Sequence, residues 1–213
     1  MNPASRREFY TRLRQNNPAP TTELNYSSHF ELLIAVILSA QATDVGVNKA
    51  TARVFPLART PQQMLDLGLE RLLELIRTIG LYRAKARNVL GTSARLLEDF
   101  AGEVPNDRDA LESLPGVGRK TANVVLNTAF AEPTIAVDTH LFRVANRTGL
   151  GRGKTPLAVE KALLKNTPAE FLKDAHHWLI LHGRYVCRAR APLCATCITS
   201  DLCDYRRRAA RPK

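Results

Sequence analysis

The sequence predicts an all-α fold, and two observations support that prediction. Apolar residues recur with helical spacing along most of the chain, and no convincing alternation with a period of two residues indicates strands. Residues that favour helix starts and helix stops also separate these apolar segments at short intervals. We therefore expect about ten helices joined by short loops.

The helix-start signals follow one another along the chain. Ser27 and Ser28 can cap an apolar segment over residues 30–40, and Asp44 can cap a second helix that ends near Pro56. Threonine followed by proline suits a cap and a first helical position, and this pair occurs at Thr60-Pro61 and Thr155-Pro156. Glycines stand where helices should stop, at Gly68, Gly80 and Gly102.

The composition indicates a globular protein without a membrane span. The chain has 213 residues, 45% of them hydrophobic, which suffices for one good core or for two smaller cores with a cleft between them. The longest strictly apolar run, residues 32–38, is far below the roughly 20 residues that a spanning helix needs, and the N-terminal residues lack the apolar segment of a secretory signal. We therefore expect a cytoplasmic protein, in which clustered cysteines are more often metal ligands or redox centres than disulfides.

The net charge favours a polyanionic partner. The formal charge is +11, and residues 184–213 alone contain eight Lys or Arg against Asp201 and Asp204. An excess of basic residues of this size favours binding to nucleic acid or to an anionic membrane surface. A basic tail that only improves solubility would explain the same numbers, so the charge alone leaves both interpretations open.

A phosphate-binding turn is indicated by LPGVGRKTANVVLNTAF, residues 114–130. Pro115 excludes a helix interior, while Gly116 and Gly118, on either side of Val117, allow a tight hairpin whose backbone can approach a ligand closely. The apolar spacing that follows indicates a helix, so its unpaired N–H groups and its positive dipole end coincide with the hairpin. Together with a short preceding helix over residues 109–114, capped by Asn106 or Asp107, this predicts a helix-hairpin-helix. An ordinary αα-hairpin is the alternative, and Arg119 and Lys120 favour phosphate binding over it.

Lys120 is a candidate nucleophile. We expect it in the first turn of the predicted helix, where the dipole and the neighbouring Arg119 both disfavour the charged ammonium. The neutral amine is the form that attacks carbon. A second phosphate contact is an equally good interpretation from the residues alone.

Asp138 is a candidate carboxylate in PTIAVDTHLFRVANRTG, residues 133–149. It stands between an apolar run and a predicted helix, so its simplest role is the N-cap of that helix. A capping carboxylate that faces a cleft can also take part in catalysis. We interpret His140, two residues further on, as a helix-surface residue rather than a ligand.

Four cysteines form the last informative group. Cys187, Cys194, Cys197 and Cys203 have the spacing C-x6-C-x2-C-x5-C and are all the cysteines in the chain. Zinc is one candidate, but zinc ribbons use two CxxC pairs and only one such pair is present, so the spacing mildly favours a cubane with four separate corners.

The segment between the first two cysteines contains Arg188 and Arg190. With Arg184, these residues can offset the negative charge of such a centre. If the polyanionic partner is a nucleic acid, we expect this loop to contact its phosphates, and the contribution of the loop to affinity then falls as salt rises.

Three motifs together resemble one family: LPGVGRKTANVVL, AVDTH and the cysteine spacing. In these the chain resembles the bacterial endonuclease III family of the helix-hairpin-helix DNA glycosylase superfamily. The resemblance covers essentially the whole length, including LLIAVILSAQATDVGVNKAT (32–51), TIGLYRAKA (78–86) and HHWLILHGRYVC (176–187).

The resemblance implies a bifunctional DNA glycosylase and abasic-site lyase. Lys120 then attacks the anomeric carbon of a damaged nucleotide and forms a Schiff base, whose β-elimination cuts the strand 3′ to the lesion, with Asp138 as the assisting carboxylate. Gln41 fills the space of the flipped base and Leu81 acts as a wedge. Ser39 and Asp44 are expected to line the pocket. From the residues alone, Gln41 could be a helix-surface amide, Leu81 a core residue and Asp44 only a cap.

The same resemblance implies two lobes with the active site in the cleft between them. Residues 22–132 form a six-helix lobe with the helix-hairpin-helix at about 107–130, and residues 1–21 with 133–213 form a lobe containing one [4Fe-4S] cluster at 187–203. The implied partner is double-stranded DNA with oxidised pyrimidines or abasic sites, bound by a monomer that is cytoplasmic and nucleoid-associated.

Two alternatives remain open. A monofunctional glycosylase of the adenine-mismatch type shares the hairpin and the cluster, but such enzymes lack a lysine at the position of Lys120. A non-enzymatic DNA-binding protein with a four-cysteine metal module needs only the hairpin and the basic tail. The lysine in its electropositive turn favours an enzyme.

Overall fold

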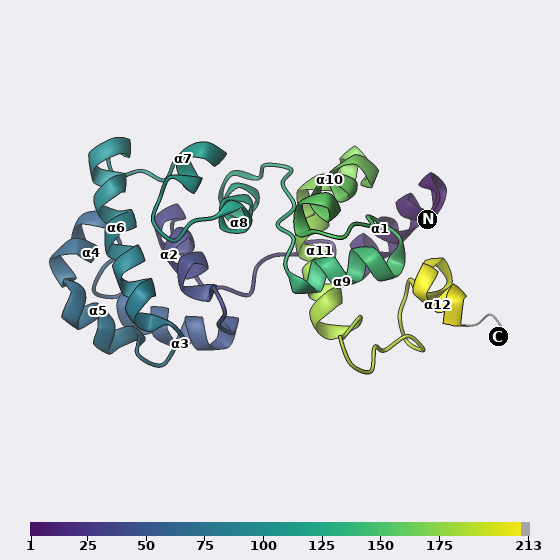
Figure 1. The fold of residues 1–213 in the computed structure, drawn as a ribbon, viewed down its shortest axis with the longest axis horizontal. Coiled ribbons are helices and arrows are strands. Elements are labelled where there is room, and N and C mark those ends of the chain that lie inside the picture. The colour runs from purple at the N-terminus through teal and green to yellow at the C-terminus, as the bar shows by residue number, and fades with distance from the viewer. Residues whose placement is uncertain (210–213) are drawn as a thin grey trace. The chain divides into compact units, whose positions relative to one another are not determined.

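Helices make up all of the regular structure in the described part of this protein. The structure is a computed structural model that describes residues 1–209, and within this range it contains twelve α-helices, two 3-10 helices and no strand (Figure 1). The all-α prediction is confirmed. None of the described helices is both long and apolar enough to cross a membrane. The α-helices are α1 (Pro3–Asn16), α2 (His29–Ser39), α3 (Asp44–Val54), α4 (Pro61–Leu67), α5 (Leu69–Ile76), α6 (Tyr82–Phe100), α7 (Arg108–Glu112), α8 (Arg119–Phe130), α9 (Thr139–Thr148), α10 (Pro156–Asn166), α11 (Leu172–Tyr185) and α12 (Asp204–Ala209), and the 3-10 helices are η1 (Ala169–Phe171) and η2 (Ser200–Leu202).

The chain divides into two compact units. Glu23–Phe130 form one of them, here called the hairpin unit, which contains α2 to α8. Met1–Thr22 and the chain from Ala131 onward form the other, here called the cysteine unit. The hairpin unit is therefore one continuous segment, whereas the cysteine unit is assembled from both ends of the chain.

The core of the hairpin unit is organised around α2. Residues 30–38 of this helix are all buried, and α2 packs against α3, α6 and α8. A helix that is covered on all sides has no polar face, which explains the uninterrupted apolar run in the sequence. Ser28 is the N-cap of this helix, as the sequence predicts, and its hydroxyl accepts a hydrogen bond from the N–H of Glu31. The buried Glu31 carboxylate in turn accepts hydrogen bonds from the N–H and the hydroxyl of Ser27, both at 2.7 Å.

The cap of α3 differs from the prediction. Thr43 is the N-cap, and its hydroxyl accepts a hydrogen bond from the N–H of Gly46 at 3.1 Å. Asp44, the predicted cap, is instead the first helical residue. Adjacent Thr and Asp can both cap a helix, so the sequence could not decide between them. At its observed position the Asp44 carboxylate still lies near the positive end of the helix dipole.

The predicted Thr-Pro helix starts are both confirmed. The hydroxyl of Thr60 accepts a hydrogen bond from the N–H of Gln63 at the start of α4, and Thr155 does the same for Ala158 at the start of α10. In each case proline follows at the first helical position, where its missing N–H costs no hydrogen bond.

Aromatic side chains from both chain ends form the core of the cysteine unit. Tyr10 of α1 stacks on Phe171 with ring centroids 5.6 Å apart, and it lies 6.4 Å from the ring of Trp178 in α11. The Tyr10 hydroxyl is 2.9 Å from the hydroxyl of Thr167, and the Trp178 indole N–H donates to the carbonyl of Asn17 at 2.8 Å. Because buried aromatic pairs contribute both apolar area and specific geometry, this cluster holds the N-terminal helix against α11.

Candidate functional site

The predicted helix-hairpin-helix is formed by α7, the turn of residues 114–117 and α8. Asp107 caps α7 by accepting a hydrogen bond from the N–H of Ala110 at 2.8 Å. The turn closes through a hydrogen bond from the N–H of Val117 to the carbonyl of Leu114 at 3.1 Å. Gly116 has a φ of 78°, a conformation that side chains strongly disfavour, so glycine is required there.

The hairpin leaves backbone donors free at the start of α8. No acceptor among the described residues takes the N–H of Gly116 or Gly118, and both glycines are exposed. Val117 between them is buried and anchors the turn. Free N–H groups and the positive end of a helix dipole at one place form an anion-binding surface.

Lys120 is the second residue of α8. Its side chain is exposed and makes no hydrogen bond or ion pair with the described residues, and the first turn of α8 contains no acidic residue. Arg119 beside it is half-buried and has a partner. Lys120 is therefore free to contact a ligand that the hairpin binds.

Gln41 and Leu81 lie in two adjacent loops of the hairpin unit, and both have a left-handed backbone. Their φ angles are 53° and 59°, although neither residue is glycine. An ideal Cβ on Gly80 would lie 3.8 Å from the carbonyl oxygen of Gln41, which places the loops side by side. Leu81 is 58% exposed and Gln41 is exposed in the turn after α2, so Leu81 is not a core residue and Gln41 is not on a helix. Residues held in this conformation cluster at functional sites.

Ser39 and Asp44 flank the Gln41 loop. The Ser39 hydroxyl donates to the carbonyl of Val36 in its own helix at 2.8 Å, so its donor is already used. Asp44 begins α3 and is half-buried. Both residues lie close to Gln41 in the chain. Their positions in the structure do not by themselves indicate a contact with a ligand.

Asp138 is the N-cap of α9 in the cysteine unit, as the sequence predicts. Its Oδ1 accepts hydrogen bonds from the N–H groups of His140 and Leu141, both at 2.8 Å. Its Oδ2 has no hydrogen-bond partner among the described residues, and the side chain is half-buried. One oxygen therefore fixes the side chain while the other remains available. The His140 ring is 3.2 Å from the Arg143 guanidinium, in keeping with a helix-surface position.

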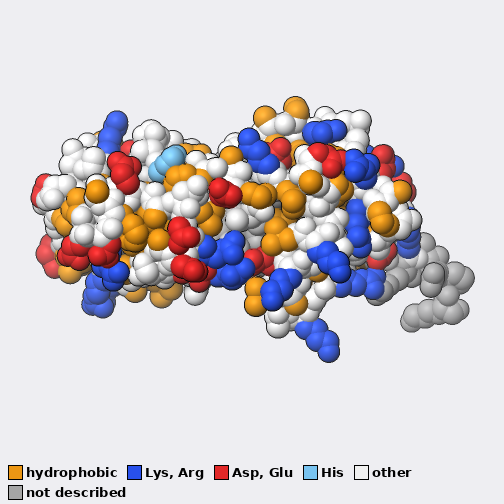
Figure 2. Space-filling model, turned by 90° about the horizontal axis from the view of Figure 1, so that it is seen from above, with side chains coloured by type: hydrophobic (Ala, Val, Ile, Leu, Met, Phe, Trp, Pro, Cys, Tyr) orange, Lys and Arg blue, Asp and Glu red, His pale blue; other side chains and the backbone are white. Residues whose placement is uncertain are grey.

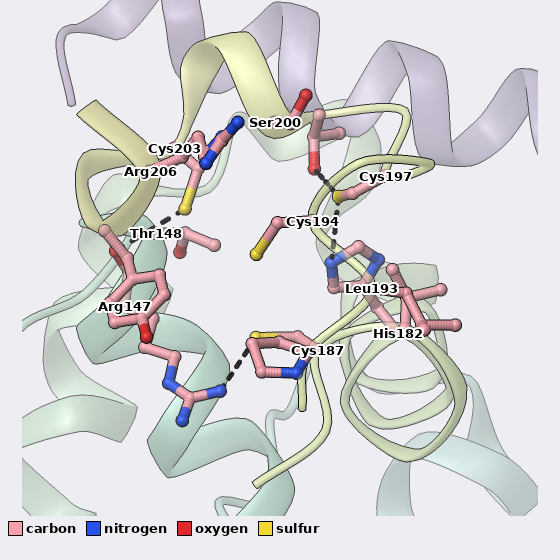
Figure 3. Close-up of a pocket in the computed structure, with 14 residues that line it drawn as sticks. Arg147, Thr148, His182, Cys187, Leu193, Cys194, Cys197, Ser200, Cys203 and Arg206 are labelled. Atoms are coloured by element: carbon pink, nitrogen blue, oxygen red, sulfur yellow. Dashed lines mark hydrogen bonds between the residues drawn. The ribbon is translucent and has the colours of Figure 1, made fainter. Parts of the chain in front are cut away.

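The four cysteines line one pocket in the cysteine unit. Figure 3 shows their sulfur atoms around a common space, which is also lined by residues from α9, α11 and the loop between α11 and α12. All four are free thiols and half-buried. Within residues 1–209, no group of three or more His, Cys, Asp or Glu side chains is placed to hold a metal ion. The four cysteines thus share one pocket.

Two arginines of α9 hold the loop that begins at Cys187. The Arg143 guanidinium donates to the carbonyls of Cys187 at 2.9 Å and Gly183 at 2.7 Å. Arg147 donates to the carbonyls of Arg188 at 2.7 Å and Ala189 at 3.0 Å, and it lies 3.7 Å from the Cys187 sulfur. Our sequence reasoning missed both residues. The sequence does contain a signal for them, because the two arginines are four positions apart and therefore share one face of the helix that follows Asp138.

His182 is a third residue that the sequence reasoning missed. It is buried, and its Nε2 lies 3.8 Å from the Cys197 sulfur. Burial lowers the pKa of His182 to about 4, so its imidazole is neutral at pH 7. The second half of the motif HHWLILHGRYVC therefore lines the pocket, whereas His176 and His177 lie earlier in α11 and do not line it.

The basic loop between Cys187 and Cys194 is open to solvent. Arg188 and Arg190 are exposed, and Ala191 has a φ of 47°, which bends the backbone sharply before Pro192. On the face shown in Figure 2, Lys and Arg side chains gather over the cysteine unit. Arg211 and Lys213, which belong to the basic C-terminal stretch, lie outside the described residues.

Comparison with known proteins finds relatives along almost the whole chain. Residues 34–169 match the family described as HhH-GPD superfamily base excision DNA repair protein. Endonuclease III of Escherichia coli (strain K12) is 66% identical over 206 residues, which are 97% of this chain and 98% of the relative. Endonuclease III of Haemophilus influenzae is 64% identical over the same shares.

Solved structures give the same result. A trapped endonuclease III–DNA covalent intermediate is 46% identical, with a TM-score of 0.91 over 99% of this chain and 100% of that chain. A non-covalent endonuclease III–DNA complex has the same identity and TM-score over the whole of both chains.

The strain at Leu81 can be measured as a difference between two substitutions. Because left-handed backbone is disfavoured for every residue with a Cβ, Leu81→Gly should be more stable than Leu81→Ala by about 0.5–1 kcal/mol. Ala84→Gly, in the ordinary helical backbone of α6, should instead lower stability by a similar amount, roughly 0.5–1 kcal/mol. Urea unfolding of the three variants measures these differences. Equal stability of Leu81→Gly and Leu81→Ala would contradict the strain.

Proposed function

The chain belongs to the endonuclease III family of the HhH-GPD superfamily, and from this premise we propose which of its residues perform the reaction. The protein is a bifunctional DNA glycosylase and abasic-site lyase of base excision repair, and DNA is its partner. We assign the nucleophile to Lys120 and the assisting carboxylate to Asp138. The observation that supports Lys120 most directly is its free, exposed side chain in the first turn after the anion-binding hairpin.

In the proposed reaction, the neutral amine of Lys120 attacks C1′ of the damaged nucleotide. The glycosidic bond breaks, and the base departs with the bonding electrons and a proton. Opening of the sugar ring gives a Schiff base between Lys120 and C1′. Loss of a proton from C2′ then expels the 3′ phosphate, which cuts the strand 3′ to the lesion.

Asp138 assists by taking the ammonium proton of Lys120 or by stabilising the cationic sugar. The Oδ2 atom is the one assigned this role, because Oδ1 is occupied by two backbone N–H groups.

Gln41 and Leu81 are proposed to open the duplex. A target base must leave the stack before its C1′ can be attacked, and the vacated space must be filled. Leu81 is an exposed apolar side chain on a strained loop, which suits a wedge, and Gln41 lies on the adjacent loop with a polar side chain that can fill the gap. Ser39 and Asp44 are proposed as pocket residues on the strength of the family resemblance alone.

The hairpin is proposed to bind one DNA phosphate through the N–H groups of Gly116 and Gly118. Pro115 and Val117 shape the turn, and Arg119 adds positive charge beside it. Contacts of this type place the protein on the backbone without reading base sequence. Selectivity for oxidised pyrimidines or abasic sites, the monomeric state and action on the chromosome in the cytoplasm are further parts of the proposal, carried by the family resemblance.

We also propose that Cys187, Cys194, Cys197 and Cys203 hold one [4Fe-4S] cluster. Four thiols line one pocket whose described lining residues include no carboxylate, and their C-x6-C-x2-C-x5-C spacing favours a cubane over a zinc ribbon with two CxxC pairs. His182 in the same pocket is neutral, while Arg147 brings positive charge next to Cys187 and offsets thiolate charge. The cluster supplies no chemical step and serves to fold the loop of Arg188 and Arg190 for phosphate contact.

Replacement of the nucleophile separates binding from chemistry. Lys120→Ala should lower strand cleavage at an abasic site by roughly a thousandfold or more. Binding to the same duplex should change little, because the proposed phosphate donors are backbone groups. Single-turnover cleavage assays measure the first quantity and fluorescence anisotropy the second. Lys161→Ala, an exposed lysine on α10, is the control and should cleave like wild type; comparable cleavage by Lys120→Ala would rule out this nucleophile.

Metal analysis tests the cluster. Protein purified without oxygen should be brown and contain about four iron and four sulfide per chain. Cys194→Ser should lose most of the iron and melt at a lower temperature, because the loop gains its order from the bound group. A colourless wild-type protein with stoichiometric zinc would overturn the cluster and leave the assignments of Lys120 and Asp138 in place.

Salt dependence tests the basic loop. If Arg188 and Arg190 each contact a phosphate, the double variant Arg188→Ala, Arg190→Ala should reduce the slope of log K against log salt by about 1–2. Arg71→Ala, whose side chain pairs with Glu74 on α5, should keep the wild-type slope. Unchanged affinity and slope in the double variant would show that the loop does not bind DNA.

A further inference from the structure

The turn that carries the free donors has the geometry of a type II β-turn. Its four residues are 114–117, with proline in the second place and glycine in the third. The N–H of Val117 donates to the carbonyl of Leu114, and Gly116 has a φ of 78°. These are the features of type II, whereas a type I turn has a negative φ at the third residue.

The two turn types differ mainly in the orientation of their central peptide. In this turn that peptide joins Pro115 to Gly116, so it contains the Pro115 carbonyl and the Gly116 N–H. Rotation of this one peptide by about 180° converts type II into type I. Glycine accepts both forms, so Gly116 by itself leaves the orientation of its N–H unfixed.

A side chain of α6 fixes this orientation. The hydroxyl of Thr92 donates a hydrogen bond to the Pro115 carbonyl at 2.8 Å, and Thr92 is fully buried. The peptide is trans and planar, so its N–H points opposite to its carbonyl. With the carbonyl directed at α6, the Gly116 N–H must point away from α6, and it is indeed exposed and without an acceptor among the described residues.

The surface of α6 around Thr92 also fits the turn closely. An ideal Cβ on Gly91 would lie 3.1 Å from Cγ of Pro115, and one on Gly116 would lie 2.7 Å from Nδ2 of Asn88. The turn therefore packs directly on the Asn88–Thr92 segment, with no space for an added methyl group on either side. This contact keeps the Pro115 carbonyl within reach of Thr92.

We infer that Thr92 is a positioning residue for DNA binding: its hydroxyl holds the Pro115–Gly116 peptide so that the Gly116 N–H faces a DNA phosphate. The inference rests on the proposed function, because it needs the hairpin to bind DNA. Thr92 lies 23 residues before Pro115 in the chain and contacts no ligand itself. Its contribution is to supply one free donor in the correct direction.

Thr92→Val tests this with little change of shape, since valine keeps the branched side chain and removes the donor. We expect roughly tenfold weaker binding of a duplex with a tetrahydrofuran abasic analogue, from the loss of one charge-assisted hydrogen bond. Thr92→Ser should bind like wild type because it retains the hydroxyl. At saturating DNA, the single-turnover cleavage rate of Thr92→Val at an abasic site should stay within about threefold of wild type, since Lys120 is intact.

Ser93→Ala is the matched control. Ser93 is the next residue of α6, is also fully buried, and donates its hydroxyl to the carbonyl of Val89 in its own helix at 2.9 Å. Its loss should change stability without changing DNA affinity. Amide hydrogen exchange gives a readout without DNA: the Gly116 N–H should exchange more slowly in Thr92→Val, where it can turn inward, and at the wild-type rate in Thr92→Ser and Ser93→Ala.

Wild-type affinity in Thr92→Val, equal loss in Ser93→Ala, or no recovery in Thr92→Ser would overturn the inference. Unchanged exchange of the Gly116 N–H in Thr92→Val would also overturn it. Failure of wild type to prefer the abasic duplex over undamaged DNA would instead count against the proposed function, and the exchange experiment would still decide how Thr92 acts on the turn.

Discussion

The direction of one peptide group determines what the hairpin can do. The turn before α8 holds two backbone donors, the N–H groups of Gly116 and Gly118, that no residue in the described chain accepts, and such donors are useful only when they point outward. The hydrogen bond from Thr92 to Pro115 directs the Gly116 N–H away from the protein. Lys120 follows four residues after Gly116, in the first turn of α8. The anion site and the proposed nucleophile are therefore placed by the same local structure, and no separate element is needed to bring them together.

The cysteine unit satisfies a different constraint, because residues 187–203 contain too few large apolar side chains to form a core. In the structure the Arg143 and Arg147 guanidinium groups hold the start of this loop by donating hydrogen bonds to the carbonyls of three consecutive residues, 187–189. Arg143 also donates to the carbonyl of Gly183 in α11. The same helix, α9, is capped at its N-terminus by Asp138. One helix thus presents the proposed catalytic carboxylate at its N-terminus and supports the proposed cluster loop with its later turns. This arrangement gives a physical reason for the close spacing of AVDTH and the two arginines.

Much of this could be predicted from the sequence, because the relevant signals are local. Caps, the Pro-Gly turn and the Thr-Pro helix starts depend on residues within a few positions of each other, and Asp138 was identified as a cap in this way. The choice of Thr43 over Asp44 could not be predicted, since both side chains can cap. Thr92, Arg143 and His182 were missed because their partners lie far away in the chain or are backbone carbonyls, which leave no pattern in a sequence. The left-handed backbone of Gln41 and Leu81 was equally hidden, because neither residue favours it.

The central claim is that Lys120 becomes covalently bonded to the sugar of the damaged nucleotide. The most direct test is to reduce the complex of wild-type protein and an abasic duplex with sodium borohydride, digest it with protease, and locate the DNA adduct by mass spectrometry. We expect a single adduct on the Nζ of Lys120. An adduct on another amine, such as that of Lys85 or the N-terminus, or no adduct with active protein, would contradict it.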